Sequence, residues 1–210
     1  MHRVAILAAL ALALPAAAAP GSISGKVTAS GDPGPFVVYV EKSPGEPRAA
    51  PAPRREVVQK NSQFSPSAVW VRSGDAVDFV NRDNIYHNVF SPSEPNSFDL
   101  GLYRGGLKKS VQMQGAGEVD VYCNIHPDMK AKVLVVPPGS RVVDVVDGAY
   151  SLTDLDPGSY TIVAWSAEHE PARSQVEVRS GQTAHADFAL KPRLSMRHLN
   201  KNGEQYGRYK

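Results

Sequence analysis

The chain has 210 residues and carries 23 Lys and Arg against 21 Asp and Glu, which gives a formal net charge of +2. So balanced a charge argues against a nucleic-acid partner. The length allows one large domain or two small ones once an N-terminal leader is removed.

The N-terminus has the three parts of a secretory signal peptide. Met1–Arg3 is a short positive lead, Val4–Leu14 is apolar, and Pro15 is followed by a run of alanines. We place the cleavage after Ala18, so residues 1–18 are the predicted signal peptide and the mature protein is predicted to be periplasmic. A membrane span needs about 20 apolar residues, and this run is shorter, so no membrane insertion is expected after cleavage.

Short runs rich in Val, Tyr and Phe follow, separated by Gly, Pro, Asn and Asp, and helical patterns are almost absent. Runs at this spacing are typical of antiparallel strands in a sandwich or barrel, so the predicted fold class is all-β. The predicted strands are Phe36–Glu41, Ala68–Arg72, Ala76–Asn81, Glu118–Tyr122, Lys130–Val136, Tyr160–Trp165, Gln175–Arg179 and Ala184–Leu190.

Two proline-rich breaks divide these strands. Residues 43–54 contain four prolines and predict a linker. The second break is Val136–Gly139, with the sequence VPPG. The block between them, residues 55–137, is large enough for a small sandwich of its own.

This block holds the only cysteine of the chain, Cys123. In an exported protein an odd cysteine indicates an intermolecular bond, a reactive thiol or a metal ligand. Cys123 ends a row with Val119 and Val121 on one face of a predicted strand, so its thiol is expected to point inward. A catalytic thiol with His126 as its base is the alternative, but it would want a partly exposed and positive setting.

The residues around Cys123 favour a metal. His126 and Met129 follow it at C-x-x-H-x-x-M spacing, and His87 lies upstream at the end of another predicted strand. A thiolate, two imidazoles and a weak thioether form the trigonal site with an axial methionine that suits copper. Zinc prefers four strong nitrogen or sulfur ligands, so a methionine would be a poor fourth.

These motifs resemble those of the cupredoxins, the blue-copper proteins. FSPSAVWVRSGDAVDFVNRDNIYHNVFS resembles the family's F-x-P, V-x-x-G-D-x-V-x-F-x-N and H-N-V stretch, and VYCNIHPDM resembles its Y-x-C-x-x-H-x-x-M loop in the tight, amicyanin-like spacing. The resemblance covers about Glu56 to Val136. HNVFSPSEPNSFDLGLYRGG further resembles a periplasmic bacterial subgroup, often called methylamine-utilisation or plastocyanin-like proteins.

The resemblance implies a Greek-key β-sandwich that binds one type 1 copper ion. It implies His87, Cys123 and His126 as the strong ligands and Met129 as the long axial ligand. Asn88 matches the family's residue that pins the two ligand loops together. It further implies that Ile125, His126 and Pro127 form an apolar electron port, although Ile125 and Pro127 are equally consistent with ordinary loop packing.

The segment after the second break contains GAYSLTDLDPGSYTIVAW, in which Asp156–Gly158 supplies a turn between two strands. This segment resembles carboxypeptidase-regulatory-like domains, which are transthyretin-like sandwiches that usually open with a hairpin. We therefore predict a discontinuous second sandwich formed by residues 22–42 with residues 138–192. The alternative adds residues 22–42 to the first sandwich as an edge hairpin.

The chain ends in a basic tail, residues 193–210, with five basic residues and one acidic residue. We expect a solvated, partly disordered end, and a docking arm for an acidic partner is the alternative. Of the remaining histidines, none of His169, His185 and His198 is expected to bind metal.

The predicted function is that of a one-electron carrier between redox protein partners, without an enzymatic activity. A copper-binding or delivery protein without fast redox cycling is the alternative. A scaffold protein with a vestigial site is a third interpretation, and the intact ligand set speaks against it.

Overall fold

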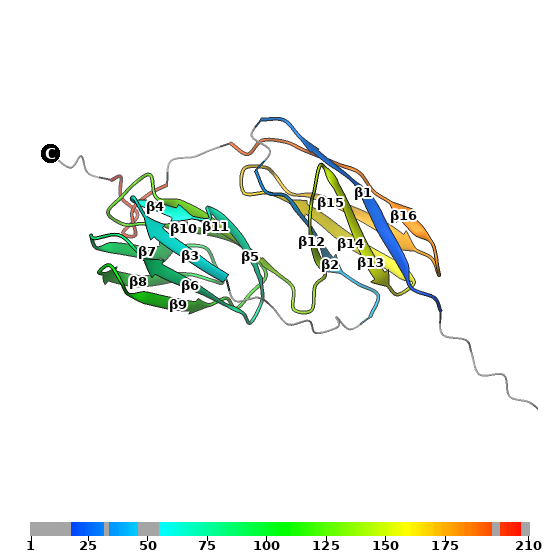
Figure 1. The fold of residues 1–210 in the computed structure, drawn as a ribbon, viewed down its shortest axis with the longest axis horizontal. Helices are drawn as coiled ribbons and strands as arrows, with labels where there is room; N and C mark the ends of the chain where they lie inside the picture. Colours follow the sequence, from blue (N-terminus) through cyan, green and yellow to red (C-terminus); the bar gives the residue numbers. More distant parts are fainter. Residues whose placement is uncertain (1–17, 32–33, 46–54, 195–197, 207–210) are drawn as a thin grey trace, which may run out of the picture.

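The computed structural model describes residues 18–31, 34–45, 55–194 and 198–206. These residues form seventeen strands and no helix, arranged as two β-sandwiches side by side (Figure 1), so the all-β prediction is confirmed. Within this part of the chain no helix is long and apolar enough to cross a membrane. Residues 1–17 of the predicted signal peptide and residues 46–54 of the predicted linker lie outside the described residues.

The first sandwich is built from consecutive strands. They are β3 (Arg55–Lys60), β4 (Gln63–Ser65), β5 (Ala68–Arg72), β6 (Ala76–Asn81), β7 (His87–Ser91), β8 (Phe98–Tyr103), β9 (Lys108–Gln112), β10 (Gly117–Tyr122) and β11 (Lys130–Val136). A five-stranded sheet, in the order β5-β11-β10-β7-β8, packs against a four-stranded sheet, in the order β4-β3-β6-β9. The alternation predicted for β10 holds, because Val119 and Val121 are fully buried in the core while Glu118 and Asp120 are only partly covered.

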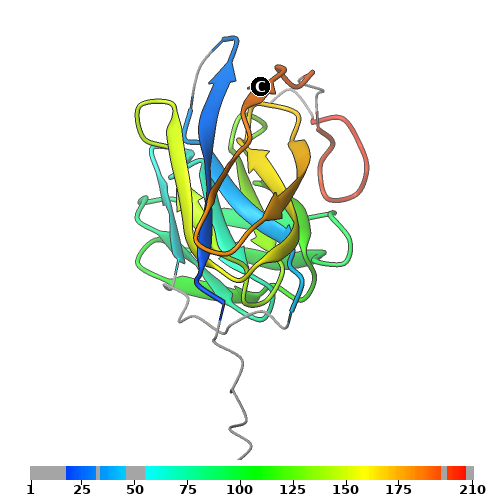
Figure 2. The ribbon, with the colours of Figure 1, turned by 90° about the vertical axis from the view of Figure 1, so that its right-hand side faces the viewer.

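The second sandwich takes its strands from both ends of the chain. They are β1 (Gly21–Ala29), β2 (Val37–Lys42), β12 (Val142–Asp144), β13 (Ala149–Leu155), β14 (Gly158–Trp165), β15 (Ala172–Val178), β16 (Thr183–His185) and β17 (Phe188–Leu190). One sheet has the order β12-β2-β14-β15, and the other has β13-β1-β16 with β17 also paired to β1. Figure 2 shows β1 in blue between β13 in yellow-green and the orange segment of β16 and β17.

The N-terminal strands therefore pair with strands that follow the first sandwich in sequence. Val38 is paired with Val143 of β12 and with Ala164 of β14, and Val40 is paired with Ile162 of β14. The chain forms β1 and β2, leaves to build the whole first sandwich, and returns at β12. In this topology the first sandwich is an insertion between β2 and β12.

One predicted strand, Ala184–Leu190, is wrong as a continuous element, because the structure divides it into β16 and β17. At the break, Asp187 Oδ1 accepts a hydrogen bond of 2.7 Å from the backbone N–H of Lys26. The carbonyl of Ala186 approaches β1 so closely that a Cβ atom on Gly25 would lie 1.8 Å from its oxygen. Only glycine at position 25 admits this approach, and a tertiary contact of this kind leaves no mark in the local sequence.

A third apolar cluster joins the two sandwiches. Along β11, Val133 and Val135 face the first core, whereas Leu134 and Val136 face the second sandwich. Strands buried on both faces appear in sequence as continuous apolar runs, and β11 ends in such a run. The buried residues of this cluster are Val37, Tyr39, Leu134, Val136, Val163 and Trp165. Burial, together with the nearby Glu41 carboxylate, raises the pKa of Tyr39 to about 12, in keeping with an apolar interface.

Glu118 closes one edge of this interface with polar contacts. Its Oε1 atom accepts hydrogen bonds from the Trp165 indole N–H at 3.2 Å and from Arg193 Nη2 at 2.9 Å. Its Oε2 atom lies 3.4 Å from Lys132 Nζ. Trp165 and Arg193 follow the first sandwich in sequence, so a single carboxylate of β10 binds side chains from both units.

Replacing Leu134 by Ala tests whether this interface stabilises the protein. Leu134 is 2% exposed, so the cavity left by truncation is expected to lower the free energy of unfolding by about 2–5 kcal/mol. The control is Val146→Ala, since Val146 is 66% exposed and its truncation should change the value by less than about 0.5 kcal/mol. Urea unfolding followed by Trp fluorescence measures both. Equal stabilities of the two variants would show that the sandwiches do not stabilise each other.

Candidate metal centre

The predicted ligand loop, residues 123–129, is the turn of the hairpin that β10 and β11 form. The last pair of this hairpin is Tyr122 with Lys130, so the loop begins and ends at neighbouring points. Backbone hydrogen bonds close it further: the N–H of Cys123 donates to the carbonyl of Met129 at 3.2 Å, and the N–H of Met129 donates to the carbonyl of His126 at 3.1 Å. The loop therefore leaves the sheet with a defined conformation.

The structure brings His87 to this loop, as the sequence predicts. His87 begins β7, which is the neighbour of β10 in the five-stranded sheet. The Nδ1 atoms of His87 and His126 lie 3.1 Å apart, and Cys123 Sγ lies 3.9 Å from the first and 3.5 Å from the second. Met129 is fully buried in the same core cluster as Cys123. Among the described residues these three donors are the one His, Cys, Asp and Glu group close enough to hold a metal ion.

The spacing of the donor atoms fits a small, soft transition metal. Bonds of about 2.0–2.3 Å to nitrogen and sulfur place the donors of a trigonal site roughly 3.5–3.8 Å apart. The three observed separations of 3.1, 3.5 and 3.9 Å bracket these values. Since His87 and Cys123 are fully buried, two of the donors have no access to water that could replace their bond to a metal.

Asp83 determines which nitrogen of the His87 ring carries the proton. Its Oδ2 atom lies 2.7 Å from His87 Nε2, and a carboxylate can only accept there, so Nε2 carries the proton. The other ring nitrogen, Nδ1, then presents its lone pair toward Cys123 and His126. A carboxylate behind a ligating histidine orients the ring and raises its basicity.

Asp83 is itself held by the backbone. Its two carboxylate oxygens accept hydrogen bonds from the N–H groups of Asn61 at 2.6 Å and Ser62 at 3.0 Å. Burial acts to raise the pKa of Asp83, but these bonds and the one to His87 outweigh it and lower the pKa below its ordinary value. A Cβ atom on Gly105 would lie 1.9 Å from the Asp83 carbonyl oxygen, so the neighbouring loop needs glycine there.

Asp83 is not among the site residues predicted from the sequence. The available signal was a carboxylate four residues before His87, within the turn segment NRDNIYH. Many turns carry an aspartate for local hydrogen bonding, so this signal is weak without the fold. What gives Asp83 its role is the approach of residues 61 and 62, which come from a different hairpin.

His126 differs from the other donors because it is partly exposed. Burial is the main cause that lowers the pKa of His126, and the neighbouring His87 ring lowers it further. The lower pKa favours the neutral imidazole that a metal requires. Of the residues predicted to form a port around it, Ile125 packs partly against the first core and Pro127 is exposed. The loop thus places one donor near the surface.

Asn88 makes a different contact from the direct bridge between ligand loops that the resemblance implies. Its Nδ2 atom donates to Asp99 Oδ1 at 2.6 Å, and its buried Oδ1 atom has no hydrogen-bond partner within the described part of the chain. Asp99 Oδ2 in turn accepts from Lys201 Nζ at 2.7 Å. The link from β7 therefore runs through Asp99 to the C-terminal segment, and a further role of Asn88 in orienting the ligands stays a prediction.

Residues 198–206 of the basic tail are largely exposed, since only His198, Asn200 and Tyr206 among them are partly buried, but they also make contacts that the sequence does not predict. These residues, which we call the C-terminal strap, lie against the ligand loop, and the strap appears in red beside the first sandwich in Figure 1. The ring of His198 stacks on Tyr122 with centroids 3.9 Å apart and planes 8° from parallel. Residues 195–197 and 207–210 lie outside the described residues.

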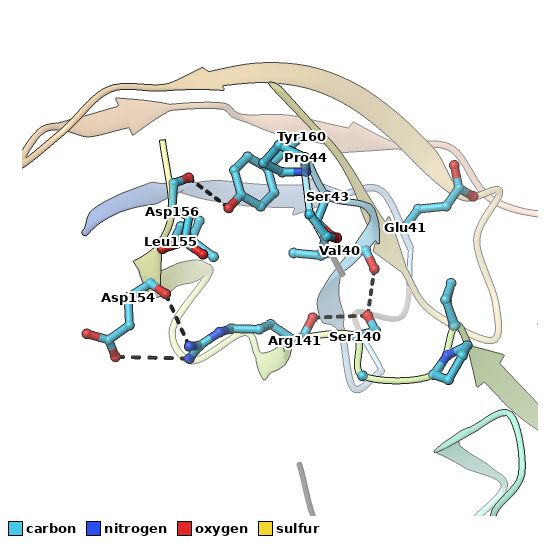
Figure 3. A pocket seen from close by; sticks show the side chains of 14 residues that line it. Val40, Glu41, Ser43, Pro44, Ser140, Arg141, Asp154, Leu155, Asp156 and Tyr160 are labelled. Atoms are coloured by element: carbon cyan, nitrogen blue, oxygen red, sulfur yellow. Dashed lines mark hydrogen bonds and ion pairs between the residues drawn. The ribbon is translucent and has the colours of Figure 1, made fainter. Parts of the chain in front are cut away.

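A separate cavity of about 150 Å³ lies where the chain passes between the two sandwiches (Figure 3). Several of its polar side chains bond to other residues of the same wall. Tyr160 donates to the carbonyl of Asp156 at 2.8 Å, and Arg141 donates to the carbonyl of Asp154 at 3.1 Å. These two hydrogen bonds hold the wall of the cavity together.

Comparisons with known proteins agree with this geometry. A family model described as copper-binding proteins of the plastocyanin/azurin family matches residues 54–136. Amicyanin-alpha of Methylorubrum extorquens is 33% identical over 89 residues, which are 41% of this chain and 75% of that protein. The family model thus matches the sandwich that carries the three donors.

Solved structures of the same kind are also similar. A Cu(I) structure of an amicyanin variant is 24% identical with a TM-score of 0.37, and the match covers 39% of this chain and 81% of that chain. A purple cupredoxin from Nitrosopumilus maritimus is 19% identical with a TM-score of 0.35, and the match covers 39% of this chain and 98% of that chain.

Replacing Asp83 by Ala tests the control of the His87 ring. Without the carboxylate the ring loses its fixed tautomer, and metal affinity is expected to fall by about 10–100-fold. Nitrogen NMR of the metal-free protein reports the tautomer, and competition with a chelator reports the affinity. Asp144→Ala, which removes an exposed carboxylate of β12, is the control. A fixed Nε2–H tautomer in Asp83→Ala would refute this role of Asp83.

Proposed function

This chain belongs to the plastocyanin/azurin family of copper-binding proteins, and on that premise we propose that its copper is held as a type 1 centre by His87, Cys123, His126 and Met129. Copper is the cofactor, and in general terms the chain is a copper-binding electron carrier. The finer proposal is that it carries single electrons between redox protein partners in the periplasm, without turning over a substrate.

The observation that carries this proposal is the convergence of a buried thiolate and two imidazole Nδ1 atoms. All three donor atoms lie within 4.8 Å of one another. His87 begins β7 and Cys123 directly follows the neighbouring strand β10, and a packed sheet resists displacement of either. Copper bound there supplies a one-electron couple between Cu(II) and Cu(I).

The protein residues favour rapid electron exchange by limiting how far the site relaxes. Asp83 holds the His87 ring, and the backbone bonds of Cys123 and Met129 hold the loop. Soft sulfur ligands suit Cu(I) while imidazoles tolerate Cu(II), so one arrangement serves both states. The donors need not move when the charge changes.

His126 is the residue through which we propose that electrons enter and leave. It is the partly exposed donor, and Ile125 and Pro127 flank it as an apolar port. An apolar border around an exposed donor lets a partner exclude water at the point of contact.

Met129 distinguishes an electron carrier from a metal-dependent enzyme. A catalytic metal keeps an open position for substrate or water. Met129 is fully buried in the same core cluster as Cys123, and as a ligand its thioether would take a position that a catalytic metal keeps open. The burial of Met129, Cys123 and His87 also weighs against copper delivery, which requires ligands that a receiving protein can reach.

We propose in addition that the second sandwich is a carboxypeptidase-regulatory-like domain, formed by residues 22–42 with residues 138–192. The support is the pairing of β2 with β12 and β14, which makes this unit discontinuous around the copper-binding domain of residues 55–137. Its role would be that of a rigid spacer or docking surface. Export to the periplasm is proposed from the predicted signal peptide, residues 1–18.

Adding Cu(II) to the purified metal-free protein tests the proposed function. We expect an intense thiolate-to-copper absorption in the visible range and reversible one-electron reduction. Cys123→Ser should abolish this band, because the charge transfer comes from the thiolate sulfur. Ser110→Ala, in β9, serves as a control that leaves the ligands intact.

Three results are distinguishable in this experiment. Colourless and readily exchanged copper in the wild-type protein would favour a delivery function. A protein that takes up no copper would favour a scaffold with a vestigial site. Persistence of the visible band in Cys123→Ser would refute the ligand assignment.

A further inference from the structure

The C-terminal strap contacts the ligand loop directly at its first residues. The Tyr206 hydroxyl donates a hydrogen bond of 2.8 Å to the carbonyl oxygen of Cys123. The backbone N–H of Lys201 donates to Asn124 Oδ1 at 2.9 Å. Together with the His198 ring on Tyr122, these contacts involve three consecutive residues, Tyr122 to Asn124, at the point where β10 becomes the loop.

The strap also reaches the second segment that carries a ligand. Lys201 Nζ forms an ion pair of 2.7 Å with Asp99, which accepts the bond from Asn88, the residue next to His87. Burial acts to raise the pKa of Asp99, but the bond from Lys201 and the other bonds to this carboxylate keep its pKa below the ordinary value. The carboxylate therefore stays charged and joins the strap to β7.

Within itself the strap is a compact turn. Asn200 Oδ1 accepts hydrogen bonds from the N–H groups of Asn202 at 2.9 Å and Glu204 at 3.0 Å. The N–H of Asn200 donates to the carbonyl of Glu204 at 2.8 Å. The ring of Tyr206 meets His198 edge to face, with centroids 5.2 Å apart. Both ends of the strap thus meet over the same part of the loop.

From these contacts we propose that the C-terminal strap is a positioning element for the copper centre, with Tyr206 and Lys201 as its positioning residues. The strap fixes the Cys123 end of the ligand loop and ties it, through Asp99, to the strand that carries His87. It contacts Tyr122, the backbone of Cys123, Asn124 and Asp99, and it acts on the ligand side chains through these groups. The effect on copper rests on the proposed function. The fixing of the ligand loop by the strap applies to the metal-free protein as well.

The test compares two single substitutions and one shortened chain with the wild type. Tyr206→Phe removes the bond to the Cys123 carbonyl, and a chain that ends at Leu194 removes the strap altogether. Tyr160→Phe is the matched control, because the Tyr160 hydroxyl also donates to a backbone carbonyl at 2.8 Å but lies in the second sandwich. Circular dichroism establishes that each form is folded.

The first readout is amide hydrogen exchange at Cys123 and Met129 in the metal-free protein. Loss of one hydrogen bond to the loop is expected to speed exchange about fivefold in Tyr206→Phe. The shortened chain should show a larger increase, and Tyr160→Phe should match the wild type. If the shortened chain fails to fold, Tyr206→Phe decides the question alone.

The second readout is the copper-loaded protein. We expect Tyr206→Phe to shift the visible thiolate band or the copper hyperfine splitting and to release Cu(I) to a chelator about fivefold faster, by the same bond loss. A strap that only stabilised the fold would leave the spectrum unchanged. If Tyr206→Phe binds copper and has the same amide exchange rates and the same visible spectrum as the wild type, the inference is wrong. If amide exchange is faster in Tyr206→Phe but the protein binds no copper, the strap still positions the loop. In that case the proposed function is refuted.

Discussion

The structure depends most on the hairpin of β10 and β11, because the end of β11 is buried on both faces and the turn of the hairpin is the ligand loop. Val119, Val121 and Val133 point into the first core, while Leu134 and Val136 pack against the second sandwich. A strand packed on both sides, as β11 is, cannot shift its register without exposing one set of these side chains. The packing of these strands therefore fixes the position of Cys123 and holds the ligand loop at its base.

The second sandwich covers apolar side chains on the outer face of the five-stranded sheet. In a lone sandwich the outer face of the five-stranded sheet would meet water, and Leu134 and Val136 would be exposed apolar side chains. Here Trp165, Val163 and Tyr39 cover that face, and Glu118 binds Trp165 and Arg193 at its edge. The chain then continues from Arg193 toward the strap that lies over the ligand loop. The same insertion topology thus supports the copper-binding domain from its outer face and brings the C-terminus to its metal end.

The donors and most strands could be predicted from sequence because their signals are local or repeat at fixed spacing. Alternation along β10 indicated an inward Cys123, and β5, β6 and β11 begin and end where their apolar patterns predict. The features that escaped prediction depend on residues far apart in the chain. Asp83 acquires its role from the backbone of Asn61 and Ser62, and the division of Ala184–Leu190 follows from its contact with Gly25. The strap reads as a polar, basic tail in sequence, since one aromatic stack and a few hydrogen bonds leave no periodic pattern.

The central claim is that the packed hairpin presents two imidazoles and one thiolate to copper in an arrangement that serves both oxidation states. X-ray absorption at the copper edge, recorded on the oxidised and the reduced full-length protein, tests this most directly. We expect two nitrogen ligands and one short sulfur ligand in both states, with little change in their distances from copper. Loss of the short sulfur bond or of one nitrogen on reduction would contradict it.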